Sequence, residues 1–498
     1  MSTTASFQLY TPDEEQAVVR KFDRKLVVFV AFLYMLSFVD RSNIGNARIA
    51  GMDDDLQSVP PREEWFEWAL GAFYIAYIAF EWMSLLWKLI PAHIYVSVLV
   101  LSWGVAASLQ AVAVNYPMLI FLRTLLGIGE AGFTGVPFYL SFFFKRHELA
   151  FRTAIFVSAA PLATTFASSL AWLVIKLGKG GSIAPWRLLF LVEGFPSVLA
   201  AVIAWHVIPD SPQTAKYLTT REKKVAHLRL QGKHSRRRQS KTDDATSPSD
   251  ATSGINAWDV LSVLTDPAAW LTAAILFLTN MAYSSFPIFL PTILTSMGHD
   301  AQSAQALAAP PYLSAFFIML ATAHASDVLR TRALFIVAHA LSSAAGYAVL
   351  AFSKQLGLAP GSLIRYLAVY PAAVGFFNVV ALTIAWSINN QKSESRQGGG
   401  FALLQVVGQF GPLVGTRLYP DEDEPYYSRG MGACAGAMLG VALLALVLRY
   451  VLMRRNRTLD DKEPGEGGGE DCDGEEESFL TTARERQGGG GERFRYML

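Results

Sequence analysis

Charged residues interrupt two long apolar runs in the first third of the chain. The first run contains Asp40 next to Arg41, and the second contains Arg123 seven residues before Glu130. An arginine among apolar residues can bind the carboxylate of a small anion, and a low dielectric favours proton uptake by an acid. These four side chains are therefore the first candidates for a site that binds an anion and exchanges protons.

Asp40 lies well inside its apolar run. If a helix begins near Leu26, Asp40 is about 21 Å along it at 1.5 Å per residue. The alternative is a helix that ends at Val39, which would leave the charged motif in an exposed loop. Ile44 and Ile49 continue the helical pattern, which favours the position inside the helix.

Arg123 and Glu130 share a helix face. Seven residues at about 100° each turn through roughly 700°, so the two side chains project on nearly the same face, two turns apart. Gly127 between them would let another helix approach closely. One interpretation is that Arg123 binds an anion while Glu130 takes up a proton. The other is a structural ion pair that holds the fourth apolar segment against the first.

Further polar residues occupy other apolar runs. Glu81 lies about two turns from the lysine that ends its segment, so a packing or gating role is at least as well supported as a role in substrate binding. Tyr34, Tyr74 and Tyr77 could line a binding cavity, although a single tyrosine is more often a core or interfacial residue. Asn378 is a further substrate-binding candidate, in the second half of the chain.

The segments that must position these residues are strongly apolar. Of the 498 residues, 52% are hydrophobic and 17% are charged, against about 25% charged in ordinary globular proteins. Residues 1–25, 208–267 and 454–498 hold 45 of the charged residues, which leaves 38 for the other 368. A water-soluble core with so little charge would precipitate, so the composition predicts a polytopic membrane protein in contact with the lipid bilayer.

Twelve windows are long and apolar enough to cross a bilayer as helices of about 20 residues. They are approximately 26–48, 66–88, 92–113, 117–140, 152–176, 187–207, 268–290, 305–325, 332–352, 364–386, 399–418 and 430–452. The first window, with its charges, and the eleventh, rich in glycine, are the least regular. The predicted fold is an all-α membrane protein with twelve transmembrane helices, six on each side of a polar stretch.

This pattern divides the chain into five parts. We expect a cytoplasmic N-terminal segment (1–25), a first six-helix bundle (26–207), a cytoplasmic linker (208–267), a second bundle (268–453) and a disordered cytoplasmic tail (454–498). Lysine and arginine gather in the loops on the side of both termini, which places that side in the cytoplasm. The basic cluster Arg236–Arg238 is interpreted as part of a linker that faces lipid, in preference to a nucleic-acid patch.

Several kinds of chemistry lack support in the sequence. A net charge of +1 offers no overall attraction for nucleic acid, and the two cysteines have neither disulfide-framework nor metal-site spacing. The chain contains no P-loop, no Gly-X-Ser-X-Gly and no His-Glu-X-X-His motif. We therefore expect no enzymatic activity, no catalytic residue, no metal and no cofactor.

At the charged motifs, the sequence resembles the major facilitator superfamily, and within it the fungal branch of anion:cation symporters, which includes allantoate, nicotinate, pantothenate and biotin permeases. The matching stretches are DRSNIGNARIAGM (40–52), FYIAYIAFEWMSLLWKLIP (73–91), RTLLGIGEAGF (123–133), YLSFFFKRHELAFR (139–152), WRLLFLVEGFPSV (186–198), PIFLPTILTSMG (287–298), PPYLSAF (310–316) and PYYSRG (425–430). One departure is the loop signature between the second and third spans, which is reduced here to Trp87–His93.

This resemblance implies two six-helix bundles with a cavity between them at mid-membrane, and transport by alternating access. It further implies that Asp40 and Glu130 carry the proton, that Arg41 contacts the substrate carboxylate, and that Arg123 is structural.

The resulting hypothesis is a monomeric secondary transporter, in the plasma membrane, that takes up a small organic anion with protons. The anion would be a carboxylated vitamin or nitrogenous metabolite such as nicotinate, pantothenate or allantoate. One alternative is an exporter of a drug or secondary metabolite on the same fold, and another is a nutrient sensor that signals without transporting.

Overall fold

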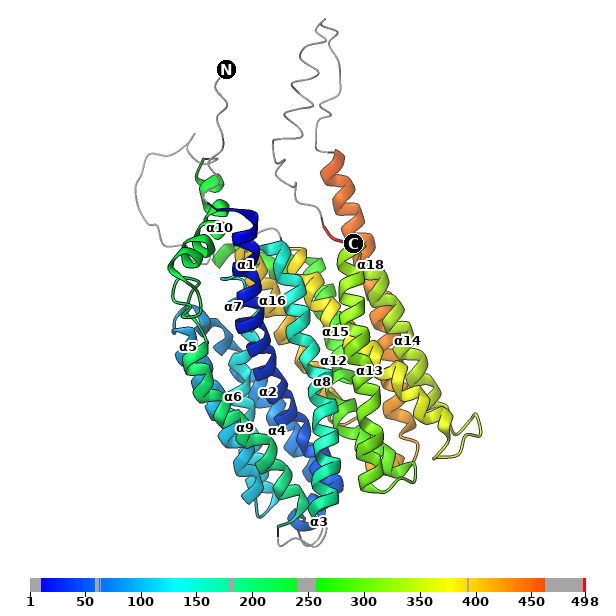
Figure 1. Ribbon diagram of the computed structural model, residues 1–498. Coiled ribbons are helices and arrows are strands. Elements are labelled where there is room, and N and C mark those ends of the chain that lie inside the picture. The colour runs from blue at the N-terminus through cyan, green and yellow to red at the C-terminus, as the bar shows by residue number, and fades with distance from the viewer. Residues whose placement is uncertain are drawn as a thin grey trace, which may run out of the picture.

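The computed structural model describes residues 10–58, 62, 64–178, 183–239, 257–391, 394–461 and 496–498. Every regular element among them is helical, and the long helices run side by side in two groups (Figure 1). The predicted all-α fold of twelve transmembrane helices in two six-helix bundles is confirmed.

The first bundle contains six spans, of which the fourth is built from two helices. Its helices are α2 (Val28–Ala47), α4 (Trp65–Phe80), α5 (Ala92–Leu109), α6 (Tyr116–Ala131) continued by α7 (Val136–Leu140), α8 (Arg146–Gly178) and α9 (Pro185–Val207). Short 3-10 segments extend α4, α5 and α6. The short helix α3 (Asp53–Leu56) follows α2.

The second bundle repeats this arrangement. Its helices are α12 (Pro267–Ser296), α13 (Ala301–Val328), α14 (Ala333–Ala351), α15 (Leu363–Asn389), α16 (Glu394–Gly408) continued by α17 (Phe410–Gly415), and α18 (Ser428–Asp461). All twelve predicted windows overlap these spans. The helices begin and end within a few residues of most windows, and α8, α12 and α18 run several residues further.

Nine helices of the described chain are long and apolar enough to cross a membrane by length and composition alone. The segments that fall short are α2, α4 and the α16–α17 pair. Helix α2 contains Asp40 and Arg41, α4 itself has 16 residues, and a break at Gln409 divides the eleventh span into helices of 15 and 6 residues. These three segments all line the space between the bundles, where polar side chains have other polar groups as neighbours.

Helices α1 (Pro12–Phe22) and α10 (Thr220–Gln239) and residues 496–498 lie at one end of the helix bundles, and α3 lies at the other (Figure 1). We call these the terminal face and the opposite face. At the terminal face, α1, α10 and the start of α8 are joined by ion pairs. The Arg229 guanidinium lies 2.6 Å from Glu148 Oε2 and 3.2 Å from Glu15 Oε1, and Lys145 Nζ lies 2.5 Å from Glu15 Oε1.

The bundles meet along α2 and α12, α8 and α13, α8 and α15, and α4 and α17. Within the first bundle, α6 packs closely on α4 because Gly127 has no side chain. A Cβ at this position would lie 2.4 Å from the Phe73 carbonyl oxygen. Small residues at helix contacts are the usual way for membrane helices to approach closely.

The predicted tail differs from the structure at both of its ends. Helix α18 continues to Asp461, eight residues into the segment expected to be disordered, and Tyr496–Leu498 is packed against the second bundle. The apolar face of α18 continues through Leu452 and Leu459, which explains the longer helix. The acidic and glycine runs of the predicted tail lie outside the described residues, as do residues 240–256 of the predicted linker.

Candidate functional site

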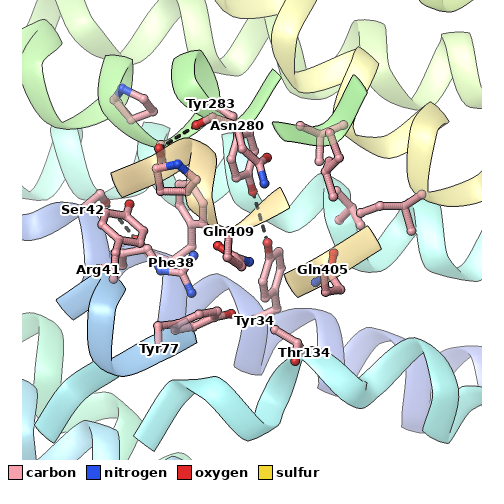
Figure 2. A pocket seen from close by; sticks show the side chains of 18 of the residues that line it. Tyr34, Phe38, Arg41, Ser42, Tyr77, Thr134, Asn280, Tyr283, Gln405 and Gln409 are labelled. Carbon is pink, nitrogen blue, oxygen red and sulfur yellow. Dashed lines mark hydrogen bonds between the residues drawn. The ribbon is translucent and has the colours of Figure 1, made fainter. Parts of the chain in front are cut away.

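A cavity lies between the two bundles, lined by α2, α4, α7 and α8 from the first and α12, α15, α16 and α17 from the second (Figure 2). The space between its side chains measures about 780 Å³, including the part open to solvent. Its polar lining residues are Tyr34, Arg41, Ser42, Tyr74, Tyr77, Thr134, Asn280, Tyr283, Ser284, Gln405 and Gln409. Of the described residues that line it, Arg41 alone is charged.

Arg41 is held between a carboxylate and aromatic rings. Its Nη2 donates to Oε2 of Glu130 at 2.7 Å, and its Nε donates to the same oxygen at 3.1 Å. The guanidinium carbon lies 4.9 Å from the ring centre of Tyr77 and 5.3 Å from that of Phe73. Aromatic faces attract a cation without neutralising it, so this environment holds a positive charge at the cavity wall.

Arg123 binds the backbone of α2. Its Nη1 and Nη2 each donate to the carbonyl oxygen of Arg41 at 3.2 Å, and the side chain is fully buried. Arg41 therefore lies against the face of α6 that Arg123 and Glu130 share. The two charges two turns apart do not pair with each other, because Arg41 of α2 occupies the space between them and bonds to both.

Asp40 is placed away from the cavity, because adjacent residues of a helix project about 100° apart. Its Oδ2 accepts a hydrogen bond from Ser197 Oγ of α9 at 2.7 Å. Glu193 lies one turn before Ser197 on the same helix, and it is also buried. Neither oxygen of the Glu193 carboxyl has a hydrogen-bond partner in the described part of the chain. The first bundle thus contains a buried carboxyl that the sequence analysis did not single out.

The other predicted site residues divide into two groups. Tyr34, Tyr74 and Tyr77 line the cavity, and the Tyr34 hydroxyl lies 3.1 Å from that of Tyr283 on α12 (Figure 2). Glu81 is buried at the start of the 3-10 segment after α4 and does not line the cavity. Asn378 is also buried outside it, and its Nδ2 donates to the Val374 carbonyl of its own helix at 2.7 Å. The cavity therefore gives no support to the substrate-binding role predicted for Asn378.

The second bundle contributes neutral polar side chains that sequence reasoning did not select. Tyr283 and Ser284 lie on α12, Gln405 lies on α16, and Gln409 lies between α16 and α17. Asn280 was visible as a polar residue in an apolar run, and its Nδ2 donates to the Gly408 carbonyl at 3.1 Å. Neutral polar residues are common in packed helices, so no pattern in the sequence separates the others from ordinary packing residues.

The cavity is sealed toward the opposite face. Gly45 of α2 packs so closely on α12 that a Cβ there would lie 2.1 Å from the Ile288 carbonyl oxygen. Arg48, just beyond α2, lies 2.9 Å from Asp53 and 2.6 Å from Asp421, and the second of these ion pairs joins the two bundles.

Toward the terminal face, the lining continues through Pro137, Phe156 and Phe401, each of which lies on a terminal-side half of its span. The cavity therefore extends from Arg41 toward the terminal face.

This arrangement can bind a small molecule with a negative group at Arg41 and hydroxyl or amide partners around it. Hydrogen bonds from ionised donors are stronger than neutral ones, so Arg41 dominates the recognition of charge. Within the described ranges, no group of three or more His, Cys, Asp or Glu residues could hold a metal ion.

Comparisons with known proteins agree with this architecture. A family model described as Major Facilitator Superfamily matches residues 30–416. The MFS transporter prlL of Fungal sp. (strain NRRL 50135) is 31% identical over 454 residues, which are 89% of this chain and 87% of that protein. The high-affinity nicotinic acid transporter of Saccharomyces cerevisiae is 25% identical over 444 residues, covering 89% of this chain and 79% of its own length.

Solved structures show the same fold. The proton:xylose symporter XylE, bound to 6-bromo-6-deoxy-D-glucose, superimposes with a TM-score of 0.66 and 13% identity, over 85% of this chain and 95% of that one. XylE from E. coli in a partially occluded inward open conformation gives a TM-score of 0.61 with 12% identity, over 85% of this chain and 98% of that one. The protein is an integral membrane transporter and not an enzyme, and the chain belongs to the Major Facilitator Superfamily.

Proposed function

We propose that this transporter takes up a small organic anion together with protons, by alternating access of the cavity to the two sides of the membrane. The observation that carries the proposal is the position of Arg41: it lines the cavity, and its guanidinium is bonded to the Glu130 carboxylate. An anion that enters the cavity meets a positive charge whose present partner is a carboxylate of the protein.

The pair provides a way to couple the two species. While Glu130 is ionised, it competes with the substrate carboxylate for Arg41. When Glu130 takes up a proton, it loses its charge, and a buried guanidinium without a counter-ion costs about 3–5 kcal/mol. The substrate anion replaces the lost charge, so proton binding strengthens anion binding, and by linkage anion binding strengthens proton binding to the same extent.

Charge balance then determines what drives uptake. A monovalent anion carried with one proton is electroneutral, so only the proton concentration difference drives it. A second proton would add about 2.3 kcal/mol per 100 mV of membrane potential. Asp40 is the second proton carrier in this proposal. It is bonded to Ser197, away from the cavity, so its protonation would act on the packing of α2 against α9.

Tyr34, Tyr74 and Tyr77 would hold the rest of the substrate through neutral contacts, with the polar residues of α12 and α16 opposite them. Arg123 keeps a structural role, because both of its terminal nitrogens bond to the backbone of α2. Glu81 retains a proposed gating role at the end of α4.

Two observations support a substrate class: the positive charge of Arg41 in the cavity and the named substrate of one relative. We infer a carboxylated vitamin or nitrogenous metabolite such as nicotinate, pantothenate or allantoate, in the anion:cation symporter branch of the superfamily. The nicotinic acid transporter of Saccharomyces cerevisiae, with 25% identity, supports a carboxylate ligand. Neutral residues around Arg41 select for shape, which distinguishes these anions from one another.

We place the terminal face in the cytoplasm and the protein, as a monomer, in the plasma membrane. Basic residues are concentrated near this face, as expected for the cytoplasmic side. They include Arg20, Lys21, Arg24, Lys25, Lys145, Arg146, Arg330, Arg332, Arg454, Arg455 and Arg457.

Competition uptake tests the proposal. Permease-deficient cells that express the protein are given labelled nicotinate at several external pH values, with a panel of unlabelled carboxylates, and with or without a protonophore. We expect accumulation of nicotinate, or of whichever panel anion is taken up, to rise as external pH falls and to disappear with the protonophore. Accumulation that is indifferent to pH would remove the symport mechanism, and lower accumulation than in control cells would indicate an exporter.

The Glu130→Gln variant tests the coupling residue. It should still exchange external for internal anion, because the amide cannot compete as an ion for Arg41, but it should concentrate the anion less than the unmodified protein, because only Asp40 is left to carry a proton. Glu422→Gln, exposed on the opposite face, is the matched control and should behave as the unmodified protein.

A further inference from the structure

A short segment at the end of the chain occupies a binding site on the terminal face. Tyr496, Met497 and Leu498 lie beside the second bundle, where Figure 1 marks the end of the chain next to α18. Their partners come from three helix ends far apart in sequence: the start of α14, the end of α15 and the last part of α18.

Two asparagines each bind both the N–H and the carbonyl group of one residue in this segment. Asn456 of α18 accepts from the Tyr496 N–H through Oδ1 and donates to the Tyr496 carbonyl through Nδ2, each at 2.9 Å. Asn390, at the end of α15, does the same for Met497, at 2.8 and 3.2 Å. A side-chain amide that bonds to both polar groups of one residue imitates the partner strand of a sheet.

Further contacts complete the site. Trp386 Nε1 donates to the Met497 carbonyl at 2.8 Å, and the Arg332 N–H donates to the Leu498 oxygen at 2.6 Å. The Tyr496 side chain is buried, and the Arg455 guanidinium lies 5.8 Å from its ring centre. Main-chain bonds with alternate side-chain contacts are the pattern by which proteins bind extended peptides.

The site connects a helix that lines the transport cavity to two that do not. Val380 and Ile384 of α15 line the cavity, and Trp386 and Asn390 follow on the same helix. Neither α14 nor α18 contributes a lining residue. The docked segment therefore ties the terminal end of α15 to the outer helices of its bundle, while the cavity extends toward this end.

We propose that Tyr496–Leu498 is an intramolecular latch, docked in a peptide site formed by α14, α15 and α18, which holds the end of α15 away from the first bundle. In this proposal, a rocking movement of the bundles closes the cavity by bringing the terminal end of α15 closer to α8, the long helix of the first bundle that α15 contacts elsewhere. The docked segment opposes that movement, and its release favours closure. This function is separate from the choice of substrate and from proton coupling.

Cross-linking tests the docking. In a background with Cys434→Ala and Cys472→Ser, the variants Asn456→Cys and Tyr496→Cys are combined, and a protease site is inserted between residues 462 and 495. Oxidation should keep the two fragments joined after cleavage under non-reducing conditions. Tyr450→Cys in place of Asn456→Cys is the matched control, because Tyr450 is exposed on the same helix. Equal cross-linking from both positions would overturn the docked arrangement.

Cavity labelling tests the latch. Phe401→Cys, in the same background and in lipid nanodiscs, is reacted with a polar maleimide without any substrate. A chain that ends at residue 495 should label at least threefold more slowly, because its cavity is closed more of the time. A synthetic peptide of residues 492–498 should restore the rate, and a peptide with alanine at 496–498 should not.

The asparagine variants separate docking from folding. Asn390→Ala and Asn456→Ala are introduced into the chain that ends at residue 495. Each should leave the thermal midpoint of that chain unchanged, but the synthetic peptide should no longer raise the labelling rate. Unchanged labelling after removal of 496–498, or rescue by the alanine peptide, would overturn the latch.

Discussion

Arg41 directs two of its donors, Nε and Nη2, to a single oxygen of Glu130. Among the described residues, Nη1 of Arg41 bonds to no acceptor, although the side chain lines the cavity. The pair therefore leaves part of the guanidinium available to a ligand even while Glu130 is bound. In the symport mechanism that we propose, a substrate carboxylate binds at this edge first and takes the place of Glu130 once that residue is protonated.

The two arginines should respond differently to lysine. Arg41→Lys replaces a planar fork by a point charge that cannot bond to Glu130 and a substrate in the same geometry. We expect the apparent affinity for the transported anion to fall by about tenfold or more, equivalent to about 1.4 kcal/mol. Arg123→Lys loses one of two bonds to the Arg41 carbonyl and should lower the thermal midpoint with less than about a threefold change in affinity, near 0.6 kcal/mol. Uptake kinetics and thermal unfolding check both, and equal losses of affinity would contradict the assignment.

Glu193 should tolerate loss of its ionisable group. Its carboxyl is buried without hydrogen-bond partners, and burying a charge in such a place is costly. We expect Glu193→Gln to unfold at the same temperature as the unmodified protein or higher at neutral pH. Glu130→Gln is the contrasting variant and should unfold at a lower temperature, because it breaks the ion pair with Arg41. A clear loss of stability in Glu193→Gln would show that this carboxylate has an ionic partner.

Gly45→Ala should disturb the seal at the opposite face. The new Cβ would lie 2.1 Å from the Ile288 carbonyl, so α2 and α12 must separate. Overpacking of this kind costs about 1–3 kcal/mol. We expect a lower thermal midpoint and slower uptake. Gly71→Ala is the matched control, because nothing lies within 4 Å of its added Cβ, and a helical glycine-to-alanine change there should be neutral or stabilising. Similar behaviour of the two variants would contradict the close contact.

Acidic pH should loosen the ion pairs at the terminal face. Burial would raise the pKa of Glu15, but its bonds to Lys145 and Arg229 outweigh burial and hold the pKa below the ordinary value of 4.5. For Glu148, burial likewise raises the pKa and the nearby Arg229 lowers it, and the net result is again a lowered pKa. A carboxyl whose pKa is lower in the folded than in the unfolded protein stabilises the fold at pH values above its unfolded-state pKa. This stabilisation is lost as the pH falls through its folded-state pKa.

The thermal midpoint of the purified transporter should therefore fall as pH is lowered from about 5 toward the lowered folded values. Glu15→Gln should unfold about 1 °C lower at neutral pH for each kcal/mol lost, because the unfolding entropy of about 2.1 cal/mol/K per residue is large for a chain of 498 residues. It should also show a smaller acid-dependent decline. Glu422→Gln, on the opposite face, is the control and should keep the full decline. An undiminished decline in Glu15→Gln would show that other groups account for the acid sensitivity.

The sequence predicted the helices well because the bilayer imposes a length. Each of the twelve windows overlaps a span, and even the irregular eleventh window corresponds to the broken pair α16–α17. The pattern also placed Arg123 and Glu130 on one face of their helix. The sequence pattern could not predict how α2 is rotated about its axis relative to α6. This rotation places Arg41 between Arg123 and Glu130.

Other features of the site depend on neighbours distant in sequence. Asp40 and Arg41 are adjacent, yet one faces α9 and the other faces the cavity, and this division requires the packing of three helices. The docking of Tyr496 was also out of reach, because the acidic and glycine-rich residues before it are typical of a disordered tail. Its site is built from single asparagines that have no recognisable spacing in the sequence.

The polarity of α2 has a consequence for how the protein is made. Asp40 and Arg41 each add about 2.5–3.5 kcal/mol to the insertion of an isolated helix when they lie near its centre. Their partners are synthesised much later, since Glu130 follows Arg41 by 89 residues and Ser197 follows Asp40 by 157. During translation, the first span must remain beside the translocon or in contact with other helices until α6 and then α9 emerge. The first span therefore becomes stable in lipid only as part of the assembled bundle.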